Sequence, residues 1–348
     1  MSLRTLRGAS FSTSAAAALA AVSVAVAIWL SLQPHRTGDL HRVALWTSQW
    51  VHGTHLYGPA SDVDYPPWAI VTLAPLGAVP AGWLPWLWGA VNLIALRFVA
   101  GRLTSSRGAI FFLLIAAGTI RTLNQFSLVS MALAVAGITA VGPLSPLWLG
   151  LSLMKPQIGL VFWLHALWQR QWRLALLSAV VPLLLTVVYA AQAHVPVLDV
   201  PAAYAQSIHV QYDIVLWGQT EITSALRTAW PSWPAAWLAV LVAVAAFAPF
   251  AIRRPQLGFA VASLLAFRHL SYDLILLLPW VATLEGAGLW LAVLLLVADP
   301  SAIAGLLVPD SALARHADRL MLCAVWACGL VAFVRSRRRS AIDAGLSE

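Results

Sequence analysis

The stretch that decides the fold is Leu174–Ala191, which reads LALLSAVVPLLLTVVYAA and carries no charged side chain. A helix needs about 20 apolar residues to cross the hydrocarbon layer of a bilayer. Further long apolar runs lie at Ser14–Leu32, Trp83–Ala100, Phe126–Val141, Leu144–Trp168, Ala235–Ile252 and Met321–Val334. Shorter runs lie at Pro67–Val79, Ile110–Ile120, Leu257–Phe267, Leu274–Leu284 and Gly288–Ala298. We therefore expect an all-α, polytopic membrane bundle of about 10–12 transmembrane helices, some of them broken.

The composition agrees with a membrane location. Hydrophobic residues make up 61% of the 348 residues and charged residues 10%, whereas soluble domains carry about a quarter of charged residues. The 21 basic residues outnumber the 13 acidic ones, but most of them flank the apolar runs. Cytoplasmic loops of membrane proteins are enriched in Lys and Arg, so the basic excess indicates how the chain is oriented in the membrane. We therefore expect no nucleic-acid partner.

Alternation of the predicted helices places both termini and several arginine clusters in the cytoplasm. These clusters are Arg4 and Arg7, Arg170 and Arg173, Arg253 and Arg254, and Arg335 to Arg339. The same alternation counts Pro67–Val79 as a crossing and puts the loop around Arg97, Arg102 and Arg107 outside, against the charge rule.

Two longer and more polar loops interrupt what we take as a single transmembrane domain over residues 1–348. They span about 33–65 and about 194–233, and the alternation places both outside the cell. In the first loop, Leu40, Val43, Trp46 and Trp50 recur at helical spacing, which predicts an amphipathic helix in the membrane interface. Tyr65-Pro66-Pro67 then leads into the second apolar run, with proline in the first helical turn.

Polar residues at membrane depth are the informative ones, because each is costly there unless it is partnered or functional. Lys155 is the only lysine of the chain and precedes a helix-breaking proline. Its ammonium group either extends to a lipid headgroup, pairs with a carboxylate or binds an anionic ligand. Other candidates of this kind are Arg121, Asn124, Gln125, Gln219, Arg268, His269, Tyr272 and Asp273.

Asp39 follows the first apolar run and has two interpretations. It caps the amphipathic helix or pairs with Arg42, or else it is a general base that deprotonates an acceptor hydroxyl. Four histidines nearby, with Asp62 and Asp64, do not follow a metal-ligand spacing, so we expect no metal site. The nucleotide, serine-nucleophile and thiol motifs are likewise missing from the sequence.

Several short motifs in a fixed order resemble glycosyltransferase family 87. These are Gly38-Asp39-Leu40, Gly53-Thr54-His55-Leu56-Tyr57-Gly58, Asp64-Tyr65-Pro66-Pro67, Asn124-Gln125, Lys155-Pro156, Gln219-Thr220 and Ser271-Tyr272-Asp273. The family comprises GT-C-type membrane glycosyltransferases that depend on polyprenyl-phosphate sugars. The resemblance implies a GT-C bundle in a bacterial cytoplasmic (inner) membrane, with an extracytoplasmic active site.

The resemblance also implies a reaction. Asp39 would be the catalytic base of an inverting transfer of mannose or another hexose from a polyprenyl phosphate to a glycolipid or glycan of the cell envelope. Lys155, Arg268 and His269 would stabilise the leaving phosphate. Further substrate contacts would come from Tyr57, Tyr65, Arg121, Asn124, Gln125, Gln219, Tyr272 and Asp273. No cofactor and no metal are needed, and the partners are the two substrates and membrane lipids.

A transporter or a flippase for lipid-linked sugars is the alternative, since it would also contain isolated charges within the membrane. Transporters commonly consist of paired halves. The loop that contains Asp39 has no counterpart in the second half of the chain, which favours the enzyme. A scaffold without chemistry would leave Lys155, Arg121 and Arg268 unexplained.

Overall fold

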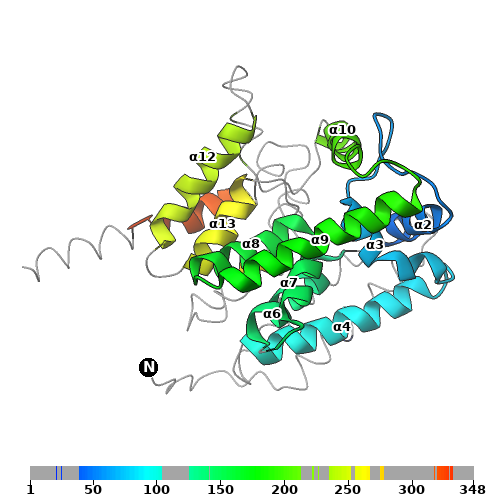
Figure 1. The fold of residues 1–348 in the computed structure, drawn as a ribbon. Coiled ribbons are helices and arrows are strands. Elements are labelled where there is room, and N and C mark those ends of the chain that lie inside the picture. The colour runs from blue at the N-terminus through cyan, green and yellow to red at the C-terminus, as the bar shows by residue number, and fades with distance from the viewer. Residues whose placement is uncertain are drawn as a thin grey trace, which may run out of the picture. The chain divides into compact units, whose positions relative to one another are not determined.

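The computed structural model describes residues 39–103, 125–140, 142–212, 235–251, 255–266, 275–277, 320–328 and 330–331, with a few single positions elsewhere. These ranges contain helices and no strand. The chain divides into two compact units, the first made of residues 1–216 and 281–297, the second of 217–280 and 298–348. All-α architecture is thus confirmed for the described residues (Figure 1).

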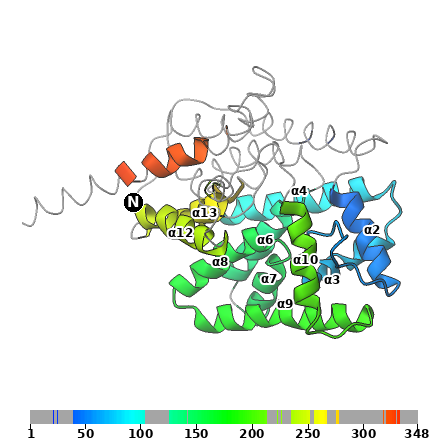
Figure 2. The same cartoon turned by 90° about the horizontal axis from the view of Figure 1, so that it is seen from above.

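The first unit contains most of the described helices. They are α2 (Asp39–Val51), α3 (Pro67–Thr72), the 3₁₀ helix η1 (Ala74–Ala78), α4 (Leu84–Leu103), α6 (Ser127–Thr139), α7 (Ser145–Ser152), α8 (Pro156–Trp168), α9 (Trp172–Gln192) and α10 (Val200–Tyr212). In both cartoon views α2 and α3 lie at one end of this unit, where α4 begins and α9 ends (Figures 1 and 2).

In the second unit, α12 (Ala235–Phe247) leads through the 3₁₀ helix η2 (Ala248–Phe250) to α13 (Pro255–Ala266). Helices α12 and α13 pack together, and the rings of Phe247 and Phe259 stack with centroids 4.5 Å apart.

Two described helices are long and apolar enough to cross a membrane, Leu84–Arg102 in α4 and Trp172–Gln192 in α9. At 1.5 Å per residue, α9 is about 31 Å long, which matches the hydrocarbon thickness of a bilayer. Its surface carries exposed apolar side chains, among them Leu176, Leu183 and Leu184, each more than 60% exposed. Such a surface is costly in water and favourable in lipid. The predicted spans Ser14–Leu32, Ile110–Ile120 and Gly288–Ala298 lie wholly or almost wholly outside the described residues.

The apolar run Pro67–Val79 does not form the expected membrane helix. Helix α3 begins at Pro67, as the proline predicted, but it contains 6 residues and is followed by the short η1. Neither is long enough to span a bilayer. Both pack against α2, and a Cβ atom at Gly77 would lie 2.6 Å from the Ser48 backbone nitrogen. The prediction of a crossing here was therefore wrong.

The run Leu144–Trp168 is two helices rather than one. Helix α7 ends at Ser152 and α8 begins at Pro156. A proline disfavours helical backbone in the residue before it, and Lys155 has φ −119° and ψ 89°. The break therefore places Lys155 at the N-cap of α8.

Close packing through small residues holds the broken segment in place. A Cβ atom at Gly150 of α7 would lie 2.6 Å from the Ser178 carbonyl oxygen of α9. Ser130 Oγ of α6 donates a hydrogen bond of 2.6 Å to the Ser152 carbonyl oxygen at the end of α7. Small residues allow helix backbones to approach closely in membrane proteins. The start of α8 is thereby fixed relative to α6 and α9.

Candidate functional site

Helix α2 carries Asp39 as its first residue. The predicted apolar face is confirmed, because Leu40, Val43, Trp46 and Trp50 are all buried. This face packs against α3, η1, α4 and α9. Since α2 is anchored to the body of the unit, the position of Asp39 is set by the protein core.

The half-buried Asp39 carboxylate contacts the segment that precedes α6. Gln125 Nε2 donates a hydrogen bond of 2.7 Å to Asp39 Oδ2, across 86 positions of sequence. Within the described part of the chain this is the only hydrogen bond or ion pair of the Asp39 side chain, so the pairing with Arg42 is not formed there. The structure thus shows a hydrogen bond between two residues that the sequence analysis identified as separate site candidates.

Lys155 contacts the residue two positions after Gln125, at the start of α6. It is 5% exposed, and its Nζ donates a hydrogen bond of 2.6 Å to Oγ of the fully buried Ser127. Ser127 is the first residue of α6 and Lys155 is the N-cap of α8, and neither helix has a side-chain hydrogen bond at its N-cap. Helix N-termini carry partial positive charge, so both add to the positive potential around the ammonium group.

The three residues Gln125, Phe126 and Ser127 therefore connect the carboxylate to the ammonium group. Phe126 is fully buried, with its ring 4.6 Å from that of Trp88 and 5.4 Å from that of Tyr65. Trp88 Nε1 also donates to the Gln125 carbonyl oxygen at 3.2 Å. This packing makes the connecting segment a fixed support for both charged groups.

Tyr57 and Tyr65 lie in an aromatic cluster that holds the loop between α2 and α3. Tyr57 is buried, and its hydroxyl donates to the Tyr65 carbonyl oxygen at 2.8 Å. Burial, with smaller contributions from Tyr189, Tyr204 and Asp64, raises the pKa of Tyr57 well above its usual value, so its hydroxyl stays neutral. The Tyr57 hydroxyl thereby fixes the backbone at Tyr65, and the contact of Tyr57 with substrate stays a prediction.

Tyr189 of α9 is the centre of this cluster, and sequence reasoning missed it. Its ring is fully buried and stacks on Trp50, whose Nε1 donates to the Tyr189 carbonyl oxygen at 3.2 Å. Its hydroxyl accepts a hydrogen bond of 2.9 Å from Leu56 N and lies 3.4 Å from His55 Nδ1. Burial lowers the pKa of His55, which favours its neutral form. A tyrosine at the end of an apolar run is common in membrane helices. The sequence therefore did not indicate that Tyr189 is the centre of this cluster.

The remaining predicted site residues cannot be placed, because they lie outside the described residues. They are Arg121, Asn124, Gln219, Arg268, His269, Tyr272 and Asp273. Within the described ranges, no three His, Cys, Asp or Glu side chains gather where they could hold a metal ion.

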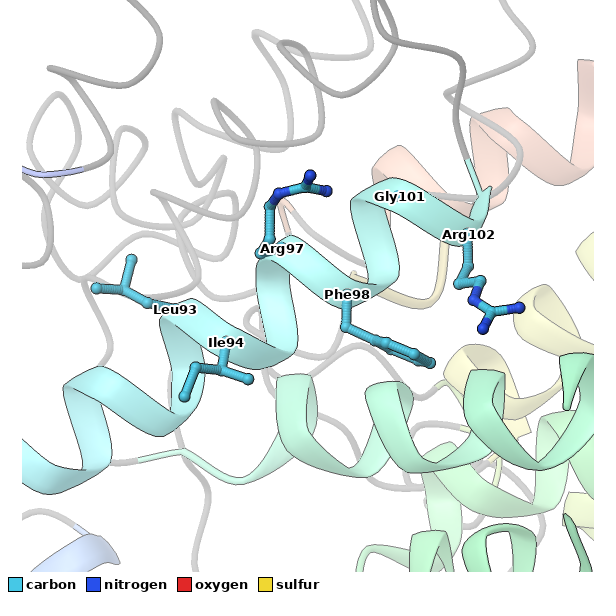
Figure 3. Close-up of a pocket in the computed structure, with 6 residues that line it drawn as sticks. All are labelled: Leu93, Ile94, Arg97, Phe98, Gly101 and Arg102. Carbon is cyan, nitrogen blue, oxygen red and sulfur yellow. The ribbon is translucent and has the colours of Figure 1, made fainter.

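One surface hollow, of about 550 Å³, lies on the second half of α4. Its lining residues are Leu93, Ile94, Arg97, Phe98, Gly101 and Arg102. Arg97 and Arg102 point away from each other, and the guanidinium carbon of Arg102 lies 5.5 Å from the centre of the Phe98 ring (Figure 3). None of the predicted site residues lines this hollow.

Comparison with known proteins identifies the family. The model of glycosyltransferase family 87 matches residues 64–279, which include Tyr65, Gln125 and Lys155. Asp39 and Tyr57 precede the matched range, but Asp39 is hydrogen-bonded to Gln125 within it. No curated protein and no solved structure matches the chain. The match covers more than half of the sequence, so the chain belongs to glycosyltransferase family 87 and is a glycosyltransferase.

Proposed function

We propose that this glycosyltransferase transfers a hexose, with mannose the first to test, from a polyprenyl phosphate to an extracytoplasmic glycolipid or glycan acceptor, with Asp39 as the general base. The observation that carries the proposal is the pair of contacts on residues 125–127, Asp39 with Gln125 and Lys155 with Ser127. A base and a cation held on one support match the two demands of the reaction, activation of a hydroxyl and stabilisation of a departing phosphate.

In the proposed reaction the acceptor hydroxyl gives its proton to the Asp39 carboxylate while its oxygen attacks the anomeric carbon. The bond between that carbon and the phosphate oxygen breaks, and its electron pair leaves with the polyprenyl phosphate. Attack opposite the leaving group inverts the anomeric configuration. Asp39 then returns the proton to solvent.

Stabilisation of the leaving group is assigned to Lys155. Its ammonium group lies where the N-termini of α6 and α8 meet, and positive charge of this kind favours a developing phosphate anion. Arg268 and His269 remain part of the proposal, because the sequence analysis predicted that they also stabilise the leaving phosphate. The donor is already activated by its phosphate ester, so the proposed step uses no nucleotide.

The orientation of the site follows from the arginines. Helix α4 begins and α9 ends beside α2, whereas Arg102 lies in the last turn of α4 and Arg173 in the first turn of α9 (Figures 1 and 2). Arginines of spanning helices favour the cytoplasmic end, so Asp39 is assigned to the extracytoplasmic side. Pro67–Val79 is not a crossing, and α7 and α8 form a pair in place of one crossing, so the alternation now assigns Arg102 and Arg173 to the same cytoplasmic side.

The setting proposed for this site is the GT-C bundle of about 10–12 spans in a bacterial inner membrane, with the apolar runs beyond the described helices supplying the remaining crossings. Membership in a glycosyltransferase family favours the enzyme over the flippase alternative.

A reconstitution assay tests the proposal. The purified protein is placed in nanodiscs with an acceptor-containing lipid extract of envelope membranes and a panel of radiolabelled polyprenyl-phosphate hexoses, with the matching nucleotide sugars as controls. Transfer is expected from a polyprenyl phosphate and not from any nucleotide sugar, and the new linkage should have the inverted anomeric configuration. Transfer from a nucleotide sugar alone, or retention of configuration, would contradict the proposal.

A further inference from the structure

Gln125 makes the described contact to Asp39, and its orientation is fixed by chemistry. The amide has two ends, a carbonyl oxygen that accepts and an NH₂ group that donates. Turning the amide round would place its oxygen against a carboxylate oxygen, at the 2.7 Å that now separates Nε2 from Oδ2. Two acceptors repel at that distance, so the NH₂ group faces Asp39.

The backbone of Gln125 is held independently of Asp39. Its carbonyl oxygen accepts from Trp88 Nε1 at 3.2 Å, and the next residue, Phe126, is fully buried. Trp88 is itself 4% exposed and lies on α4, and Asn92 Nδ2 one turn later donates to the Trp88 carbonyl oxygen at 2.9 Å. The amide donor is therefore presented to Asp39 from a rigid position.

The carbonyl oxygen of the Gln125 side chain indicates that this glutamine is more than a structural residue. Gln125 Oε1 is buried and has no hydrogen-bond partner in the described part of the chain. Buried polar atoms are nearly always satisfied, and exceptions often mark functional sites. A glutamine kept for stability alone would use both ends, whereas this one uses the end that faces the carboxylate.

On this geometry we infer that Gln125 is a positioning residue for the base, holding Oδ2 of Asp39 so that Oδ1 receives the proton of the acceptor hydroxyl. This inference rests on the proposed role of Asp39. A neutral amide suits the task, because it fixes the carboxylate through one hydrogen bond without the full pairing of a cation. Gln125 moves no proton and makes no bond to the sugar in this role.

The decisive variant is Gln125→Glu, which keeps the size of the side chain. When the introduced carboxyl group and Asp39 are both charged, they repel at this separation and Asp39 is displaced. When the introduced carboxyl group is protonated, it donates a hydrogen bond to Asp39 in place of the amide. The variant should therefore lose at least about tenfold in kcat near neutral pH and recover below about pH 6, while the wild type shows no such recovery.

Other titratable groups on α2 and on the elements packed around it and α6 are shared by wild type and variant, so they affect both pH profiles alike. They are His41, Arg42, Arg97, Arg102, Lys155, His165, Arg173 and Tyr189.

The experiment measures kcat and acceptor KM against pH for the full-length protein in nanodiscs, with the donor established by the reconstitution assay. Gln192→Glu is the matched control, because Gln192 Nε2 donates to the Val51 carbonyl oxygen at 2.7 Å on an exposed surface. Gln192→Glu should follow the wild-type profile. Gln125→Leu, which has no donor, should lose kcat at every pH with acceptor KM changed less than about threefold.

The outcomes separate the two claims. Wild-type kcat in Gln125→Leu, or a Gln125→Glu profile parallel to that of Gln192→Glu, would overturn the positioning role while Asp39→Asn stays inactive. Full activity of Asp39→Asn would instead overturn the proposed base. If Gln125→Glu does not yield folded protein by size-exclusion chromatography, Gln125→Leu alone tests the positioning role. A loss of kcat with little change in acceptor KM then supports the role, and a wild-type kcat overturns it.

Discussion

Replacement of Tyr189 by phenylalanine tests the packing that holds the loop between α2 and α3 on α9. Phenylalanine keeps the ring that stacks on Trp50, with centroids 5.9 Å apart and planes 8° apart, and removes only the hydroxyl. Leu56 N, which donates to that hydroxyl at 2.9 Å, belongs to a residue only 7% exposed. Leaving a buried donor without a partner costs about 1–3 kcal/mol.

For 348 residues the entropy of unfolding is about 0.7 kcal/mol/K, so 1 kcal/mol corresponds to about 1.4 °C in Tm and the variant should unfold roughly 1–4 °C below the wild type. Thermal unfolding in one detergent, followed by tryptophan fluorescence, measures this shift. Tyr204→Phe is the control, because the Tyr204 hydroxyl donates to the Asp64 carbonyl oxygen at 3.3 Å in an exposed position where water replaces it. Its cost should be below about 0.5 kcal/mol. Equal Tm values for the two variants would refute the reasoning.

Three further predictions concern charge, packing and topology. Lys155→Gln removes the cation but keeps a donor for Ser127, and kcat should fall about a hundredfold in the transfer assay; an unchanged kcat would exclude Lys155 from phosphate stabilisation. Gly150→Ala should lower Tm by overpacking α7 against α9, at a cost of about 1–3 kcal/mol, whereas Gly142→Ala, with open space, should not; equal Tm values contradict this. With the native cysteines replaced, Ser61→Cys should react with an impermeant thiol reagent outside the cell and Gln169→Cys should not; the reverse labelling would invert the topology.

The helices were predictable where a local signal existed. The spacing of Leu40, Val43, Trp46 and Trp50 predicted α2, where all four are buried, and the proline after Lys155 marked the break between α7 and α8. Pro67–Val79 was mispredicted because apolar content alone does not distinguish a helix that spans the bilayer from short helices buried in protein. Pro75, which lies inside the run and in the first turn of η1, was the available signal.

The site was predictable as residues but not as contacts. Asp39, Gln125 and Lys155 were recognised because each polar side chain stands beside apolar sequence, where it is costly. Their arrangement on one support depends on packing between segments 86 positions apart, which no local pattern encodes. Ser127 and Tyr189 were missed because a small hydroxyl or a tyrosine in an apolar run is common and carries no charge.

The most direct test of the central claim is the rate of sugar transfer by purified Asp39→Asn. Asparagine keeps the size of aspartate, so a capping role would survive with a loss of at most about 1 kcal/mol in stability. It does not accept a proton at neutral pH, so kcat should fall at least about a hundredfold while expression, insertion and Tm stay near those of the wild type.

A rescue experiment completes this measurement. In Asp39→Ala the space of the carboxylate is open, and added formate should restore part of the rate if a base is what the variant lacks. Loss of transfer in Asp39→Asn, together with rescue of Asp39→Ala by formate, is the predicted result. Near-normal turnover by Asp39→Asn would contradict the account and move the base to another carboxylate, with Asp64 or Asp273 the next to test.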